Sequence, residues 1–190
     1  YFGHTHYRRA IDETIREIET CDGRLFFFVD DNLVDDFEAA KDLFRALIPL
    51  HVHWVSQGTV NITGDRELMA LMARSGCLGL VVGFESISPD SLRSMGKVSN
   101  IAEDTSDYEA QIEIMRDHGL QIWAAFTLGH DHDTRESIEE TVDFAMRHKF
   151  PFAAFNILMP YPSTPLYRDL AGEGRLLYDG RWWLHPDYGF

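Results

Sequence analysis

The stretch Leu25-Phe26-Phe27-Phe28-Val29-Asp30-Asp31-Asn32 decides the fold class of this chain. Its first five residues form a continuous apolar run, which is typical of a strand in a parallel sheet that is covered on both faces. The run ends in acidic and amide residues, where a nucleotide-binding Rossmann unit would have a glycine-rich phosphate loop. The stretch therefore predicts an α/β protein and disfavours that unit.

Four further strand-like runs follow, and stretches with helical periodicity lie between them. The runs are His51–Val55, Cys77–Phe84, Ile122–Leu128 and Ala153–Met159. Apolar residues spaced by three or four, as at Ile11, Ile15 and Ile18 ahead of the first run, predict amphipathic helices. This alternation predicts a parallel sheet, and two architectures fit it: an open doubly wound sheet, or a (β/α) barrel or part of one.

Capping residues and glycines agree with the alternation. Asp35 stands where it would cap the second helix, and Thr134 where it would cap the fifth. We expect Gly23, Gly76 and Gly119 to take the left-handed conformation that ends a helix.

Composition excludes several classes of protein. The 190 residues include 17 Lys and Arg against 31 Asp and Glu, a formal net charge of −14, which disfavours nucleic-acid binding. No apolar run approaches the roughly 20 residues that span a bilayer. The two cysteines, Cys21 and Cys77, make neither a disulfide scaffold nor a metal-binding motif, and we expect reduced thiols in a cytoplasmic protein.

Polar residues gather where the predicted strands end, which is where ligands bind in both architectures. The candidates are Asp30, Asp31 and Asn32 after the first strand, Ser56 and Gln57 after the second, Glu85 and Ser86 after the third, and the loop Gly129–Asp133 after the fourth. Such acidic and amide groups suit a ligand that carries an ammonium group or hydroxyls. Glu85 ends a buried strand, where a carboxylate must be paired or used. The others also fit turns or helix caps.

Three histidine pairs have the spacing that places two imidazoles on one face of a strand. Only His130 and His132, with Asp131 between them, lie at the expected ligand-binding end, where they would suit a metal-dependent barrel hydrolase. The other two pairs, His4/His6 and His51/His53, lie elsewhere.

Four stretches, in order, resemble the radical S-adenosylmethionine (radical SAM) enzymes, and in particular the cobalamin-associated branch with the anaerobic magnesium-protoporphyrin ester cyclases and the hopanoid methylases. They are Phe28–Asn32, Gly83–Ser86 with Met95–Lys97 and Asn100, Gly129–Thr134 with Glu136, and Pro160–Tyr167. The resemblance implies a partial TIM-type (β/α)6 barrel, here truncated at the N-terminus to about five parallel strands with outer helices. We expect residues 1–190 to form a single domain.

The resemblance also implies cofactors. These enzymes hold a [4Fe-4S] cluster on a CxxxCxxC loop after their first strand, which we expect upstream of Tyr1 because neither Cys21 nor Cys77 matches it. The chain alone should therefore be inactive. Cobalamin is implied for a parent protein with a separate binding domain.

The same resemblance implies roles for the candidate residues. Asp30, Asp31 or Asn32 would approach the amino group of S-adenosylmethionine (SAM). Glu85 and Ser86 would approach its ribose or carboxylate, and the loop at Gly129 would lie against adenine.

The function that follows is the core segment of a radical SAM enzyme. In the intact protein it would bind SAM and cleave it to a 5′-deoxyadenosyl radical for methyl transfer or oxidative cyclisation of a small molecule that the sequence does not identify. Two alternatives stay open: a non-catalytic interaction domain of the same fold, and the metal-dependent hydrolase. We expect no membrane span, and a dimer through the exposed strand edge at Leu25–Val29.

Overall fold

The computed structural model describes residues 8–94 and 108–186. The stretch Met95–Lys97 and Asn100, like the pair His4/His6, lies outside the described residues. The chain divides into two compact units, one of which is Arg8–Ile157 and the other of which contains Leu158–Phe190. We describe each by itself, and a single domain over residues 1–190 stays a prediction.

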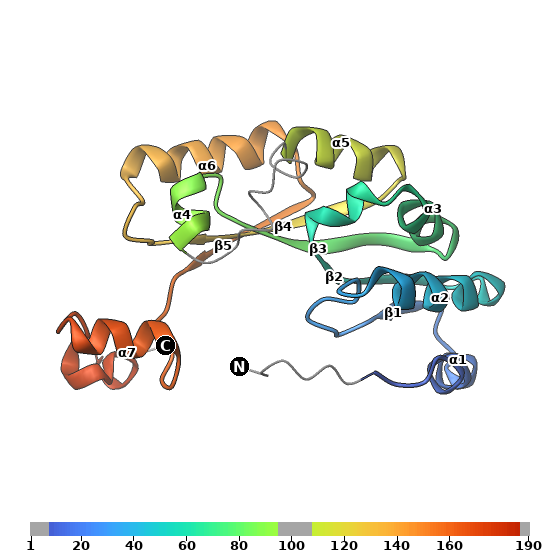
Figure 1. Cartoon of the computed structure of the whole chain (residues 1–190), viewed down its shortest axis with the longest axis horizontal. Helices are drawn as coiled ribbons and strands as arrows, with labels where there is room; N and C mark the ends of the chain where they lie inside the picture. Colours follow the sequence, from blue (N-terminus) through green and yellow to red (C-terminus); the bar gives the residue numbers. More distant parts are fainter. Residues whose placement is uncertain (1–7, 95–107, 187–190) are drawn as a thin grey trace. The chain divides into compact units, whose positions relative to one another are not determined.

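The unit Arg8–Ile157 is built on one sheet of five parallel strands that lie in the order of the sequence (Figure 1). The strands are β1 (Leu25–Phe27), β2 (His53–Gly58), β3 (Cys77–Glu85), β4 (Gln121–Leu128) and β5 (Phe152–Ile157). A doubly wound sheet reverses its strand order at a switch point, and this order has no reversal. The predicted partial barrel is therefore confirmed over the doubly wound alternative.

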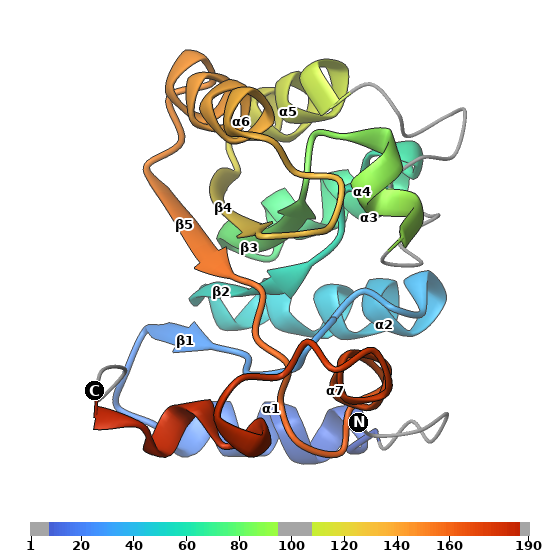
Figure 2. The same ribbon diagram turned by 90° about the vertical axis from the view of Figure 1, so that its left-hand side faces the viewer.

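Helices follow the outer side of the curved sheet, as Figure 2 shows for α2, α3, α5 and α6. The helix α1 (Ile11–Thr20) precedes β1. The elements between the strands are α2 (Phe37–Leu47), α3 (Arg66–Arg74), α4 (Pro89–Ser94), α5 (Tyr108–Asp117) and α6 (Arg135–Arg147), with the 3-10 turns η1 (Ile48–Leu50) and η2 (Val60–Gly64). None of the helices in the described residues is long and apolar enough to cross a membrane.

Burial alternates along the strands and separates the two faces of the sheet. Leu80, Val82 and Phe84 of β3 are fully buried on the outer face, where Phe84 stacks on Phe126 of β4 with ring centroids 5.7 Å apart. The alternate residues face the concave side, and Trp123 there is 38 % exposed. The core of the unit thus lies between the sheet and its helices, and the concave side presents side chains to a ligand.

Of the two predicted helix caps, the structure confirms one and moves the other by one residue. The Asp36 carboxylate, and not that of Asp35, accepts the N–H of Ala39 at 3.1 Å and caps α2, so the prediction of Asp35 was wrong by one residue. Asp35 instead donates its own N–H to the Asn32 carbonyl in the preceding turn. Thr134 caps α6 as predicted.

Two of the three predicted left-handed glycines are confirmed. Gly76 has φ 92° and Gly119 has φ 77° at the ends of α3 and α5. Gly23 was wrongly assigned, because α1 ends at Thr20 and the chain leaves the helix through Cys21 in extended backbone.

The unit that contains Leu158–Phe190 has a short helix, α7 (Pro165–Gly172), followed by the 3-10 turns η4 (Tyr178–Gly180) and η5 (Trp182–Leu184). Thr164 caps α7 by accepting the N–H of Tyr167 at 3.2 Å. The Tyr167 hydroxyl donates to the Gly180 carbonyl at 3.0 Å, which ties the helix to the turn that follows it.

Candidate functional site

The concave face ends in polar residues at the carboxyl ends of four neighbouring strands. They are Gln57 on β2, Glu85 on β3, Thr127 on β4 and Asn156 on β5. Thr127 and Asn156 pair directly in the β4–β5 register. Since the strands are parallel, these side chains share one rim, which is where barrel proteins place their sites.

Glu85 is fixed at this rim by Thr127. The Thr127 hydroxyl donates to Oε2 of Glu85 at 2.9 Å. Glu85 has φ 64°, a left-handed conformation that is uncommon for a residue with a side chain. The β3–β4 register also shifts between Gly83 and Glu85, so the strand ends in a local irregularity that redirects this one side chain.

The Glu85 carboxylate lies over Gly83. A Cβ atom built on Gly83 would be 2.7 Å from Oε1 of Glu85, so any side chain at this position would displace the carboxylate. Glycine at position 83 therefore provides the space that the carboxylate uses.

Small residues occupy the level of the concave face below the rim. Gly83, Ala125 and Ala154 pair in register across β3, β4 and β5. The next level down holds the pair Trp123 and Phe152, which are 38 % and 61 % exposed. The concave face thus offers a polar rim above an apolar floor, an arrangement that suits a ligand with a polar edge and an apolar body.

The acidic stretch after β1 lies at the same rim. The N–H of Phe28 donates to the Val55 carbonyl, and the N–H of Leu33 donates to the Gln57 carbonyl, so the stretch between them follows the end of β2. Within it Asp30 and Asp31 are exposed. The side-chain oxygen of Asn32 accepts the N–H of Val34 at 3.4 Å in a local turn.

The serines near the strand ends have structural contacts. Ser56 is fully buried and donates to the Phe28 carbonyl at 2.8 Å, which joins β2 to the end of β1. Ser86 is 6 % exposed, and its hydroxyl accepts the N–H of Ser88 at 3.0 Å in the turn that leads into α4.

Asp133 organises the loop after β4. One of its oxygens, Oδ2, accepts the N–H groups of Gly129 at 2.8 Å and His130 at 2.9 Å. The other oxygen accepts the hydroxyl of Ser91 at 3.0 Å. The backbone donors at Gly129 and His130 already bond this carboxylate, so a ligand would meet the surface of the loop and not these N–H groups.

The histidine pair in this loop does not form a metal site. His130 is 7 % exposed, and its Nε2 atom is buried without a hydrogen-bond partner, whereas His132 is exposed. Within residues 8–94 and 108–186, no group of three or more His, Cys, Asp or Glu side chains is arranged to hold a metal ion. The hydrolase alternative gains no support from this part of the chain.

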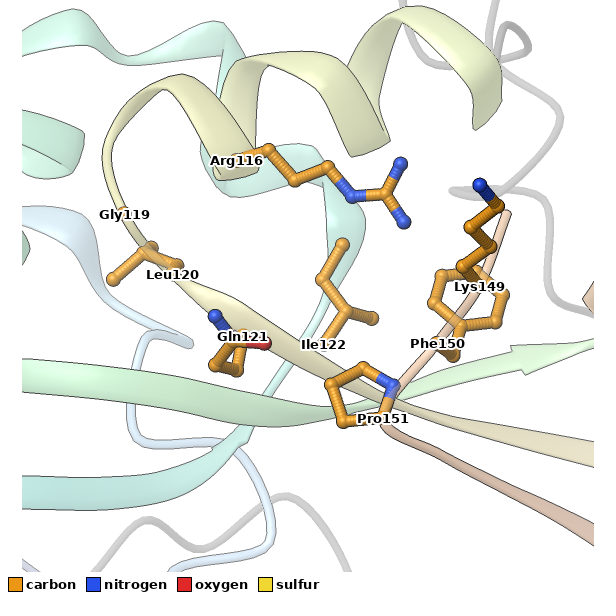
Figure 3. Close-up of a pocket in the computed structure, with 8 residues that line it drawn as sticks. All are labelled: Arg116, Gly119, Leu120, Gln121, Ile122, Lys149, Phe150 and Pro151. Carbon is orange, nitrogen blue, oxygen red and sulfur yellow. The ribbon is translucent and has the colours of Figure 1, made fainter.

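A cavity of about 280 Å³ lies at the opposite ends of the strands, between the end of α5 and the starts of β4 and β5 (Figure 3). Arg116 and Lys149 border it above an apolar floor that includes Ile122 and Phe150. Both cations stand at the C-terminal ends of helices, where the helix dipole stabilises positive charge. Their placement is therefore explained without a ligand.

Comparison with known proteins identifies the family of the chain. The sequence profile of the radical SAM superfamily matches residues 2–145. The chain belongs to the radical SAM superfamily. The bacteriochlorophyllide d C-12(1)-methyltransferase of Chlorobaculum tepidum is 32 % identical over 180 residues, which cover 92 % of this chain and 39 % of that protein.

Two further proteins are similar to this chain, one in sequence and one in fold. The hopanoid C-2 methylase of Rhodopseudomonas palustris is 29 % identical over 90 % of this chain and 33 % of its own length. The radical SAM methyltransferase TsrM of Kitasatospora setae, solved with cobalamin and a [4Fe-4S] cluster bound, superposes with a TM-score of 0.73 at 20 % identity, over 90 % of this chain and 33 % of that one. The chain thus spans about a third of the length of these relatives.

The cysteines of this radical SAM chain do not fit a [4Fe-4S] cluster. Cys21 lies between α1 and β1, and Cys77 is the first residue of β3. Both therefore lie at the amino ends of strands, away from the rim where those strands end. Burial raises the pKa of the Cys77 thiol to about 12, which disfavours the thiolate that iron requires. We therefore assign neither cysteine as a ligand of a [4Fe-4S] cluster.

Proposed function

We propose that this chain is the SAM-binding core of a cobalamin-associated radical SAM enzyme that transfers a methyl group to a small molecule. The observation that carries the proposal is the Glu85 carboxylate, which Thr127 holds on the concave rim at 2.9 Å. The names of the two relatives given above, a methyltransferase and a methylase, support methyl transfer.

The rim residues have the chemistry that SAM requires. A carboxylate accepts hydrogen bonds and repels other carboxylates, so Glu85 suits the ribose hydroxyls better than the carboxylate of the methionine portion. The exposed Asp30 and Asp31 suit the ammonium group, with Asn32 beside them. Ser86 adjoins Glu85, and the loop at Gly129 offers a surface for adenine.

The electron transfer and the methyl transfer would depend on a [4Fe-4S] cluster and on cobalamin, which the rim residues do not bind. When bound, a reduced [4Fe-4S] cluster would supply the electron for the cleavage of SAM to methionine and a 5′-deoxyadenosyl radical. The cluster would need thiolates from cysteines other than Cys21 and Cys77. We include cobalamin because TsrM, which shares the fold, was solved with cobalamin bound. The residues of this chain bind and orient SAM. The two free thiols fit a cytoplasmic enzyme.

Calorimetric titration with SAM tests the proposal. Glu85→Gln keeps the size of the side chain but removes the carboxylate, and it should weaken SAM binding by about 1–3 kcal/mol, which is roughly five- to 150-fold. Glu140→Gln on the exposed face of α6 is the matched control and should bind SAM as the wild type does. Equal affinities for the wild type and Glu85→Gln would overturn the role of Glu85.

A further inference from the structure

We infer that Thr127 is a positioning residue for SAM recognition, because its hydroxyl, together with the absent side chain of Gly83, sets the direction in which Glu85 presents its carboxylate to the ribose. This inference rests on the proposed function and adds two residues to the predicted site. The geometry is a contact between neighbouring strands: Thr127 lies on β4, and its hydroxyl reaches Glu85 Oε2 at the end of β3.

Thr127 is suited to this task by its place in the sheet. It is a β-branched residue near the end of a strand, and it pairs with Asn156 on the adjoining strand, so its backbone and its first side-chain torsion are both restricted. Glu85 is flexible by comparison, because three rotatable bonds separate its carboxylate from the backbone. A fixed donor on one oxygen therefore selects among the orientations that the glutamate could adopt.

Two unfavourable local features serve the same carboxylate. A residue with a side chain takes the left-handed conformation at Glu85, and a glycine interrupts the interior of β3 at position 83. Each disfavours a regular strand. Together they bring the carboxylate back over the sheet, with Oε1 above Gly83 and Oε2 at Thr127. Backbone strain of this kind is concentrated at functional sites.

The partial exposure of Thr127 argues against a purely structural role for its hydroxyl. The side chain is only half-buried on the concave face, so water would satisfy its hydroxyl in the absence of Glu85. The hydroxyl is accordingly not needed to avoid an unpaired buried donor, and we assign it to the orientation of the carboxylate.

The test measures the binding of two ligands by calorimetry: S-adenosylhomocysteine and its 2′,3′-dideoxyribose analogue. Each ligand is titrated into the wild-type chain, the Thr127→Val variant and the Thr127→Ser variant. Valine keeps the shape without the donor, and serine keeps the donor. We expect Thr127→Val to weaken S-adenosylhomocysteine about tenfold and to leave the dideoxy analogue within about twofold. Thr127→Ser should restore binding to within about threefold of the wild type.

A loss of equal size for both ligands would show a general disturbance of the rim and would overturn the positioning role, as would no loss at all. Gly83→Ala is the second variant if Thr127→Val does not fold, because its added methyl group displaces Oε1 and should discriminate between the ligands in the same way. If Glu85→Gln also leaves S-adenosylhomocysteine binding unchanged, the proposed function fails. If only Thr127→Val and Gly83→Ala leave it unchanged, the positioning inference alone fails.

Discussion

Ser91 donates its hydroxyl to Asp133 at 3.0 Å, although 42 positions separate the two residues in the sequence. Ser91 lies on α4 in the segment after β3, and Asp133 lies in the loop after β4. The same carboxylate accepts two backbone N–H groups of its own loop. One side chain thus joins two successive connections at the rim.

Removing this carboxylate should loosen the rim. We expect Asp133→Ala to lower the free energy of unfolding by about 1–3 kcal/mol, because two backbone donors and one hydroxyl lose their acceptor. Urea unfolding followed by circular dichroism measures the change, with Asp143→Ala on the exposed face of α6 as the control. Identical unfolding midpoints for the wild type and Asp133→Ala would contradict this account of the loop.

The stability of the chain should depend on Asp65 in acid. The hydrogen bond from Lys41, whose side chain is 7 % exposed, holds the pKa of the Asp65 carboxyl below its usual value, and the N–H of Leu68 acts in the same direction. A lowered pKa in the folded state stabilises the protein above the unfolded pKa of about 3.9, and that stability is lost as the pH falls through the folded pKa.

The comparison is between the wild type and Asp65→Asn, since asparagine keeps the cap of α3. Urea unfolding between pH 7 and pH 2.5 should show a steeper loss of stability below about pH 4 in the wild type than in Asp65→Asn. Asp143→Asn should retain the steep profile. Parallel profiles for the wild type and Asp65→Asn would refute a lowered pKa at this site.

The two cysteines should differ in reactivity. Cys77 is buried, and burial raises its thiol pKa to about 12, so it carries almost no thiolate at pH 8. Cys21 is exposed. Iodoacetamide should modify Cys21 alone in the folded chain and both cysteines in urea, as read by peptide mass spectrometry. Native modification of Cys77 at the rate of Cys21 would show that the amino end of β3 opens readily.

The edge of the sheet at β1 should promote association. In the described part of the chain β1 pairs only with β2, and Leu25, Phe27 and Val29 are 63 %, 52 % and 75 % exposed. We expect sedimentation velocity to show a dimer whose fraction increases with protein concentration. The Phe27→Lys substitution should lower that fraction. Met146→Lys, at a residue 73 % exposed on α6, is the control. A monomer at all concentrations would remove the edge as an interface.

The number and order of the strands were predictable, because each strand falls on an apolar or β-branched run. The ends were not, because the run His51–Val55 predicted Ser56 and Gln57 after the second strand, whereas β2 is His53–Gly58 and contains both. The face of each strand was harder to predict. Thr127 lies inside the run Ile122–Leu128, which reads as uniformly buried, whereas the structure buries Ala124 and Phe126 and turns Ala125 and Thr127 to the concave side. A polar residue next to the end of a run was the available signal.

The misplaced cap of α2 and the missed contact of Glu85 have different causes. The adjacent residues Asp35 and Asp36 have the same side chain, so either could cap a helix. Asp36 is the cap because α2 begins at the next residue, Phe37. The contact between Thr127 and Glu85 depends on a register shift, which involves two strands at once and leaves no pattern in either segment.

The unbroken strand order also has a consequence for how the chain folds during synthesis. Each strand from β2 to β5 pairs with the strand of the βα unit immediately before it, so none of these four has to wait for a distant segment to be translated. A nascent chain can therefore extend its sheet one strand at a time, and each new strand is added at the edge opposite to β1.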